Sequence, residues 1–94
     1  MEFQWCFNSY GSLLVKVLYK ENRVAFADFV DDGSLAHCDN AEVASSYQRQ
    51  GIGTAMYILA EIIFGKKLWD FWGKKSSPAA QAFWARKNKP FGPK

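Results

Sequence analysis

Two glycines separated by one residue, Gly51 and Gly53, lie in a polar loop that leads directly into a helical pattern of apolar residues. The first amides of a helix have no partners within that helix, and the positive end of the helix dipole lies beside them. Such a turn binds anions, and glycine allows a phosphate group to approach the backbone closely. The spacing therefore favours phosphate binding, with an ordinary strand-to-helix connection as the alternative.

Two other phosphate-binding motifs do not fit this loop. The dinucleotide-binding fingerprint requires a third small residue at the position where Met56 stands. The P-loop requires Gly-Lys followed by Ser or Thr, and the sequence lacks this combination.

Charge is distributed unevenly along the chain. Residues 1–65 carry four basic and eight acidic side chains, whereas residues 66–94 carry eight basic and one acidic, which makes the second part +7. This favours an anionic partner, and a solvated basic face is the alternative. A nucleic acid whose bases stack on Trp69, Phe71 and Trp72 would also use this charge. Nucleic-acid binding is the least favoured of the possible functions, because Trp69 and Phe71 alternate as the residues of a core strand would.

The two cysteines, Cys6 and Cys38, lie in different predicted strands and have no metal-binding or redox spacing. We expect no metal site and two small buried thiols in a reducing compartment. The first residues lack the basic and apolar regions of a signal peptide, and the predicted helix from Gly51 to Gly65 is too short to span a bilayer. We therefore expect a cytoplasmic protein without membrane contact.

The first half of the sequence predicts an antiparallel meander of four strands. Apolar and polar residues alternate with period two, and the runs are separated by short segments rich in Gly, Asn, Asp and Ser. The expected strands are residues 3–7, about 12–19, 24–30, and from about 35 to 43 or 44.

The second half predicts two helices separated by a short strand. Apolar residues from Ile52 to Ile63 recur with helical spacing and end at Gly65. Lys67–Phe71 is expected to form a fifth strand, and Ser77 followed by Pro78 should begin a helix that reaches about Lys87. The expected fold is α+β, in the order ββββαβα, with residues 1–94 forming one domain.

The glycine turn resembles the acetyl-CoA-binding motif of the GNAT N-acetyltransferase superfamily, Q/R-x-x-G-x-G/A. It reads Gln48-x-x-Gly51-x-Gly53 here, and Val43 stands where the apolar end of the family's fourth strand would be. The segment from Ser77 to Trp84 is similar to the family's N-x-x-A-x-x-F-Y motif, with Ser77 in place of Asn. Pro90-Phe91-Gly92 lies near the family's Gly-Phe, so the resemblance covers about residues 35–92.

This resemblance implies a GNAT-like fold that binds acetyl-CoA. The backbone from Gln50 to Thr54 would hold the pyrophosphate, Arg49 would reach a phosphate, and Val43 would offer backbone bonds to pantetheine between the fourth and fifth strands. Lys74, Lys75 or Lys87 could meet the 3′-phosphate. The expected cofactor-binding residues are Val43, Gln48, Arg49, Gln50, Gly51, Ile52, Gly53, Thr54 and Ser77.

Acetyl transfer to an amine requires the neutral amine, so a base or a desolvating pocket is needed. In GNAT enzymes a carboxylate on or near the fourth strand often serves, and the candidates here are Glu42 and Asp39. Side chains alternate along a strand, so the two should point to opposite faces unless a bulge intervenes. Glu42 is slightly preferred as the base, although either can be a solvated surface carboxylate. His37 is expected to be structural.

The sequence departs from the family at the position of its frequent general acid. A tyrosine is usual there, but Trp84 occupies the place and cannot donate the required proton. Tyr47 or Tyr57 could donate instead, or the thiolate could leave unaided. The remaining possibility is a domain that binds CoA without catalysis.

The chain is also short for the family. Two helices usually follow the first strand and a hairpin usually follows the last helix, and the sequence has neither. The acceptor site should therefore be open, which suits a macromolecular acceptor such as a protein lysine, or a second subunit in a homodimer. The chain resembles small phage or mobile-element acetyltransferases, some of which disable host defence proteins. The alternative function is a catalytically silent CoA-binding or protein-interaction module.

Overall fold

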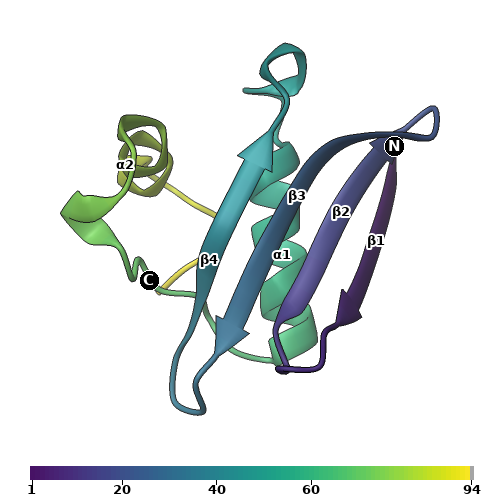
Figure 1. Ribbon diagram of the computed structural model, residues 1–94. Coiled ribbons are helices and arrows are strands. Elements are labelled where there is room, and N and C mark those ends of the chain that lie inside the picture. The colour runs from purple at the N-terminus through teal and green to yellow at the C-terminus, as the bar shows by residue number, and fades with distance from the viewer. Residues whose placement is uncertain (94) are drawn as a thin grey trace.

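Four antiparallel strands form a sheet in the order β1-β2-β3-β4 (Figure 1). The computed structural model describes residues 1–93. Each strand pairs with the next one along the chain, so the connections between them are short. The expected four-stranded meander is confirmed. The strands are β1 (Glu2–Phe7), β2 (Leu13–Tyr19), β3 (Asn22–Asp31) and β4 (Ala36–Val43).

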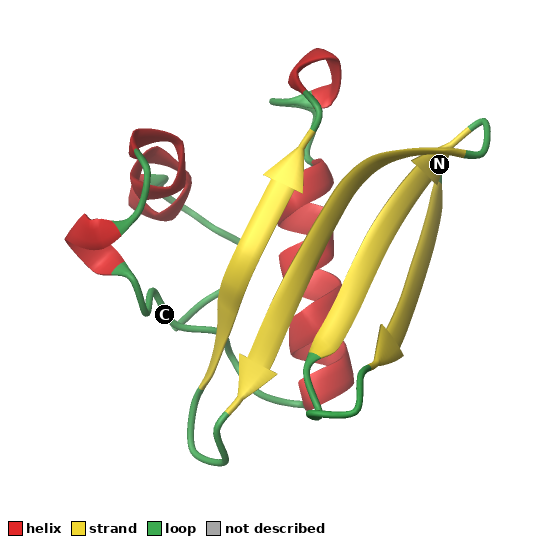
Figure 2. Ribbon diagram, in the orientation of Figure 1, coloured by secondary structure: helices red, strands yellow, loops and turns green. Residues whose placement is uncertain are grey.

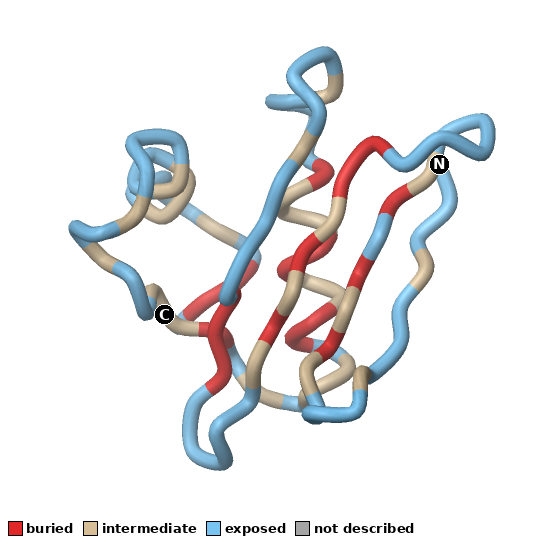
Figure 3. Tube along the Cα trace, in the orientation of Figure 1, coloured by how far each residue is buried: buried red, intermediate tan, exposed pale blue. Residues whose placement is uncertain are grey.

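The long helix α1 (Ile52–Phe64) packs against one face of this sheet (Figure 2). On β2 the alternate residues Leu13, Val15 and Val17 are buried, as the period-two pattern requires. They pair with Phe29, Ala27 and Ala25 of β3, and these alanines leave room for the helix to approach. Figure 3 shows the buried residues concentrated on β2, β3 and the adjoining side of α1.

Within residues 1–93, the other face of the sheet has no helix packed on it. Lys16, Phe26 and Glu42 pair in register across β2, β3 and β4, on the face away from α1. Only residues 8–12 connect β1 to β2, and the side-chain amide oxygen Oδ1 of Asn8 accepts hydrogen bonds from the backbone amides of Tyr10 and Ser12, both at 2.9 Å. This short turn leaves that face of the sheet open.

The expected fifth strand, Lys67–Phe71, is not formed. Leu68 alone pairs there, in a parallel bridge to Ala36. The chain then bends, because the amide of Phe71 bonds back to the carbonyl of Trp69 at 3.0 Å. The indole Nε1 of Trp72 donates to the carbonyl of Cys38 at 3.1 Å. This side chain therefore occupies a backbone acceptor that a neighbouring strand would otherwise use.

The second helix, α2 (Pro78–Ala85), begins where the sequence predicts and ends earlier than expected. The hydroxyl of Ser77 accepts a hydrogen bond from the amide of Ala80 at 3.2 Å, which is an N-cap. At Arg86 the backbone is extended, and its guanidinium donates to the hydroxyl of Thr54 at 2.9 Å. A tertiary contact thus replaces the last two helical residues predicted for α2.

The buried carboxylate of Glu61 ties α1 to two segments that follow it. Its Oε2 accepts hydrogen bonds from the amides of Leu68 at 2.8 Å and Gly92 at 2.7 Å. The ammonium group of Lys67 lies 3.5 Å from Oε1. Gly92 follows Phe91, which is 1% exposed, so this carboxylate holds the C-terminal aromatic ring against the core.

We expect Glu61→Ala to lower the free energy of unfolding by about 3 kcal/mol, because two buried amides lose their acceptor. Glu61→Gln should cost less, about 1 kcal/mol, since its carbonyl oxygen can still accept both bonds. Urea unfolding followed by circular dichroism measures both changes. The control is Ile62→Ala at an exposed neighbouring position, where the change should stay within about 0.5 kcal/mol. Equal stability of Glu61→Ala and wild type would contradict the assignment.

Candidate functional site

The loop between β4 and α1 has a fixed conformation with two left-handed residues. Ser45–Tyr47 form a short 3-10 turn, in which the amide of Tyr47 bonds to the carbonyl of Ala44 at 2.8 Å. Arg49 has φ +63° and Gly51 has φ +84°. Glycine adopts this region without strain, which explains its presence at position 51. The loop thereby turns sharply and brings the following amides to the start of α1.

The first amides of α1 have no side-chain acceptor within residues 1–93. Gly51 is the N-cap residue and lacks a side chain that could cap them, and the first intrahelical bond runs from the amide of Ala55 to the carbonyl of Gly51 at 2.9 Å. Gln50 and Gly51 are exposed, so an anion can reach this end of the helix. The site therefore fits a phosphate group.

A guanidinium group stands beside these amides. Arg86 bonds to Thr54 in the first turn of α1, and its guanidinium carbon lies 5.2 Å from the ring centroid of Phe83 and 5.9 Å from that of Phe91. The two rings and the hydroxyl hold the side chain at the positive end of the helix. Arg86 thus adds a full positive charge where the helix dipole already favours an anion.

Arg86 is not among the basic residues that the sequence predicted to contact CoA. Those residues are Arg49, Lys74, Lys75 and Lys87, all of which are exposed. Only the general excess of basic residues in the second half pointed towards position 86. The contact to Thr54 spans 32 residues along the chain and depends on how α2 packs, which no local pattern encodes.

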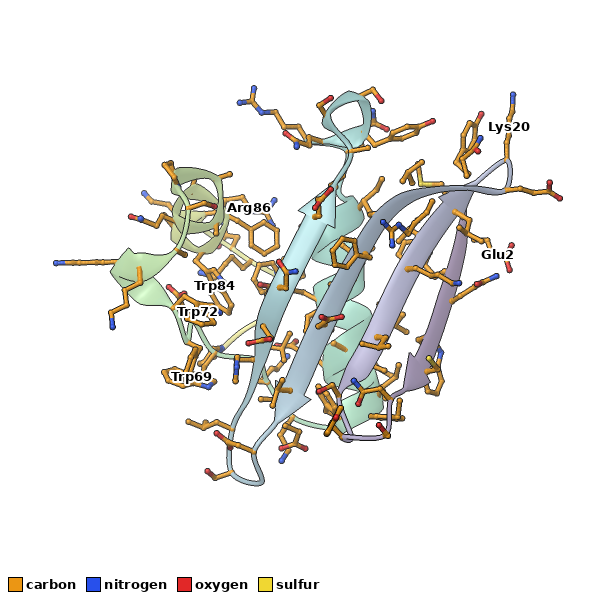
Figure 4. All side chains as sticks on the ribbon, viewed as in Figure 1. Glu2, Lys20, Trp69, Trp72, Trp84 and Arg86 are labelled. Atoms are coloured by element: carbon orange, nitrogen blue, oxygen red, sulfur yellow. The ribbon has the colours of Figure 1, made fainter. Side chains whose placement is uncertain are left out.

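The two sequence motifs lie next to each other in the structure. An added Cβ at Gly53 would be 3.5 Å from Cε1 of Phe83, so the glycine turn and α2 are in close contact. Phe83 stacks on Phe91, with centroids 4.8 Å apart, and meets Tyr57 edge-on at 4.9 Å. Figure 4 shows Arg86, Trp84, Trp72 and Trp69 on the same side of the molecule, beyond β4.

The end of β4 is held by a side chain of the loop. Nε2 of Gln48 donates to the carbonyl of Val43 at 2.9 Å, so Gln48 ties the loop to the strand. Ser77 uses its hydroxyl to cap α2. Neither contact assigns a ligand to these residues, and their roles in cofactor binding stay predictions.

A β-bulge in β4 determines which way the candidate bases face. Asn40 pairs with Asp28 and Cys38 pairs with Phe29, so Asp39 is the extra, unpaired residue. Before the bulge, Ala36 and Cys38 face α1; after it, the alternation is reversed. Glu42, which pairs with Phe26, therefore lies on the open face of the sheet. Without the bulge, Glu42 would share a face with Cys38.

Both candidate bases are exposed, and they do not share one environment. Asp39 is at the bulge, and Glu42 is three residues further along, near Val43. His37 is buried, and its ring stacks on Phe71 with centroids 4.1 Å apart. This packing agrees with the structural role expected of the histidine.

The aromatic residues near α2 do not provide a suitable general acid. Trp84 packs against Tyr57 at 5.7 Å and Phe91 at 5.2 Å between centroids. Burial raises the pKa of the Tyr57 hydroxyl well above its ordinary value. A hydroxyl less acidic than a thiol gives up its proton poorly to a thiolate. Burial also raises the pKa of the Cys38 thiol to about 11, which keeps it protonated at neutral pH.

Membrane-spanning helices and metal-binding clusters are both absent from the part of the chain that the structure describes. Its helices are all too short or too polar to cross a membrane. Groups of three or more His, Cys, Asp or Glu placed to hold a metal ion are absent from the same residues.

The comparisons with known proteins agree with this geometry. Residues 1–88 match the model of the acetyltransferase (GNAT) family, a range that includes the four strands, the glycine turn and both helices. No curated protein and no solved structure gives a significant match. Since the family model covers nearly the whole chain, this protein belongs to the GNAT family of acetyltransferases.

Proposed function

We propose that this protein is an acetyl-CoA-dependent N-acetyltransferase that holds the CoA pyrophosphate at the start of α1. Membership of the GNAT family implies acetyl transfer from acetyl-CoA. The observation that carries the proposal is the set of uncapped first-turn amides with Arg86 bonded to Thr54 beside them. Amides, helix dipole and guanidinium all favour a diphosphate at that position.

In this proposal the backbone from Gln50 to Thr54 donates to the pyrophosphate, with Arg86 and Arg49 as cationic partners. The outer edge of β4 near Val43 receives the pantetheine arm. Support comes from the missing strand on that side, because Leu68 pairs only with Ala36 at the other end of β4. Gln48 positions the end of β4 through its bond to the carbonyl of Val43.

The proposed reaction needs one proton acceptor on the protein. Glu42, or alternatively Asp39, takes a proton from the acceptor ammonium group and so makes the neutral amine. The amine nitrogen then bonds to the acetyl carbonyl carbon as the carbon–sulfur bond breaks, and it releases its second proton to water. The sulfur leaves as a thiolate, for which the reference pKa of a thiol is about 8.5, and it takes a proton from water afterwards. This route needs no general acid from the protein. It is therefore consistent with the packing of Trp84 against Tyr57 and with the burial of the Tyr57 hydroxyl.

The proposed acceptor is an amine on a macromolecule, such as a protein lysine. The short connection across residues 8–12 leaves the sheet face that carries Glu42 uncovered. A large acceptor can approach such a face, whereas a small amine would find few enclosing groups there. A role against host defence proteins would be one setting for such an acceptor.

The second candidate is a module that binds CoA without catalysis. It is favoured by Trp84, whose place in the aromatic packing supplies no acid, and by the exposure of both candidate bases. The two candidates share the cofactor site and differ in turnover.

Isothermal titration with CoA and acetyl-CoA tests the shared site. We expect Gly53→Asp to weaken binding at least tenfold, about 1.4 kcal/mol, because a carboxylate would stand next to the pyrophosphate. An Asp in the first turn favours the helix itself, so the fold should persist. The control, Gly53→Ala, places a methyl group in ordinary contact with Phe83 and should bind nearly normally. Unchanged affinity of Gly53→Asp would rule out the pyrophosphate assignment.

Arg86→Gln should weaken CoA binding about three- to tenfold at low salt, because it removes a charge-assisted contact. The difference from wild type should shrink as salt is raised, since an exposed charge is screened. Lys20→Gln, which removes an exposed charge in the β2–β3 turn, is the control. Titrations at two ionic strengths make the comparison, and equal losses for the two variants would contradict the role of Arg86.

Acetyl transfer detected by mass spectrometry separates the enzyme from the silent module. With lysine-containing proteins as acceptors, we expect Glu42→Gln to lower the rate at least 100-fold, within the usual contribution of a general base. Asp39→Asn should have a smaller effect. A rate that is unaltered in Glu42→Gln and lost in Asp39→Asn would transfer the role to Asp39. CoA binding without transfer by the wild-type protein would favour the silent module.

A further inference from the structure

Strand β1 forms an uncovered edge of the sheet. It pairs with β2 on one side only, and its outer side carries the free amides and carbonyls of an edge strand (Figure 1). Natural sheets protect such edges with lysines, prolines or bulges. Over Glu2–Phe7 the strand has none of these, and Glu2 is its one charged residue. Such an edge is suited to pairing with another strand.

Three large aromatic residues line one face of this edge. Phe3, Trp5 and Phe7 pair with Val17, Val15 and Leu13, whose side chains face α1. Yet Trp5 and Phe7 are each 50% exposed and Phe3 is 37% exposed. The aromatic stripe lies on the core side of the sheet but is not fully covered.

The position of α1 explains this exposure. Tyr57 and Glu61 face α2 and the C-terminal segment, while Leu59 and Ile63 lie on the opposite side of the helix and are only partly buried. The last residue of α1, Phe64, reaches Phe7 with ring centroids 6.3 Å apart. The helix therefore covers β2, β3 and β4 and leaves most of the β1 stripe exposed.

We propose that a second copy of this chain pairs with β1, so that two sheets join into one through antiparallel β1 strands. Antiparallel pairing about a two-fold axis presents the same surface from both copies, which a single edge strand can satisfy. An axis perpendicular to the sheet keeps both α1 helices on one face. The aromatic stripes of the two copies then form one continuous apolar layer.

The aromatic spacing selects the register. With Trp5 on the axis, Trp5 lies opposite Trp5 of the second copy, and Phe3 lies opposite Phe7 in both directions. All three aromatics thereby obtain aromatic cross-strand neighbours, which is a favourable pairing. In the same register Glu2 lies opposite Asn8, so the two Glu2 charges are at opposite ends of the junction.

The surface available suits a weak or moderate dimer. A fully buried aromatic side chain removes roughly 150–250 Å² from water. From the exposed fractions of Phe3, Trp5 and Phe7, the stripe would contribute about 300 Å² per copy, or about 600 Å² in all, before Met1 and the backbone are added. The total approaches the lower bound of about 1,000 Å² for a specific interface. We expect a dissociation constant in the micromolar range or weaker.

Sedimentation equilibrium from about 10 µM to 1 mM tests the proposal. Wild-type protein should shift from monomer to dimer over this range, and Trp5→Lys should weaken the association at least tenfold by placing two charges on the axis. Leu35→Lys is the matched control, with a similarly exposed side chain in the β3–β4 connection, and should associate as wild type does. A wild-type monomer at 1 mM, or a Trp5→Lys variant that dimerises normally, would overturn the proposal.

Disulfide trapping tests the register without removing the aromatic stripe. Gln4 would lie opposite Cys6 of the second copy, about 5 Å away between Cα atoms, which is within reach of a disulfide. Oxidised Gln4→Cys protein should therefore run as a covalent dimer on a non-reducing gel. The control is Lys16→Cys, on the same face but one strand further from the edge. Cys6 is exposed, so the expectation of two buried thiols is wrong for it, whereas buried Cys38 should not interfere. Equal cross-linking of both variants would refute the register.

Discussion

The carboxylate of Glu61 is the contact on which the arrangement of the second half depends. A helix normally exposes its glutamates, but this one is buried and accepts the amides of Leu68 and Gly92. One residue of α1 thus fixes both the segment that follows the helix and the segment that carries Phe91. A buried charge is tolerated only when hydrogen bonds replace its water, and the two amides provide them.

The candidate site follows from that arrangement. Phe91, held by the bond at Gly92, stacks on Phe83, and both rings lie close to the guanidinium of Arg86. Arg86 reaches Thr54 from this position. The cation at the start of α1 is therefore positioned by a carboxylate at the other end of the helix, through a chain of packed aromatic rings.

The elements with strong periodicity could be predicted from the sequence. Alternation along β2 and β3 and the helical spacing after Gly51 reflect burial on one face, which local sequence encodes directly. The alternation of Trp69 and Phe71 was misleading, because these rings pack edge-on against each other at 5.2 Å and do not mark a strand in a ladder. A periodic pattern predicts which side chains share a face. It does not predict which backbone groups form hydrogen bonds.

The rest of the site depends on contacts between distant residues. From the sequence, a bulge could be named only as the feature that would change which face Glu42 lies on. Its position at Asp39 depends on how β4 pairs with β3. Arg86 and Glu61 look like ordinary surface residues in the sequence. Their roles arise from partners 32 and 31 residues away, which no motif in this chain specifies.

The bond from Trp72 to Cys38 has a consequence for the outer edge of β4. A strand leaves its neighbour only when a whole ladder of bonds breaks, but an indole leaves by rotation about two side-chain torsions. A neutral hydrogen bond of this kind stabilises by about 1 kcal/mol. Trp72 is also 42% exposed, so part of its ring already lies in solvent. Thermal fluctuation alone can therefore free the carbonyl at this edge while the sheet stays intact.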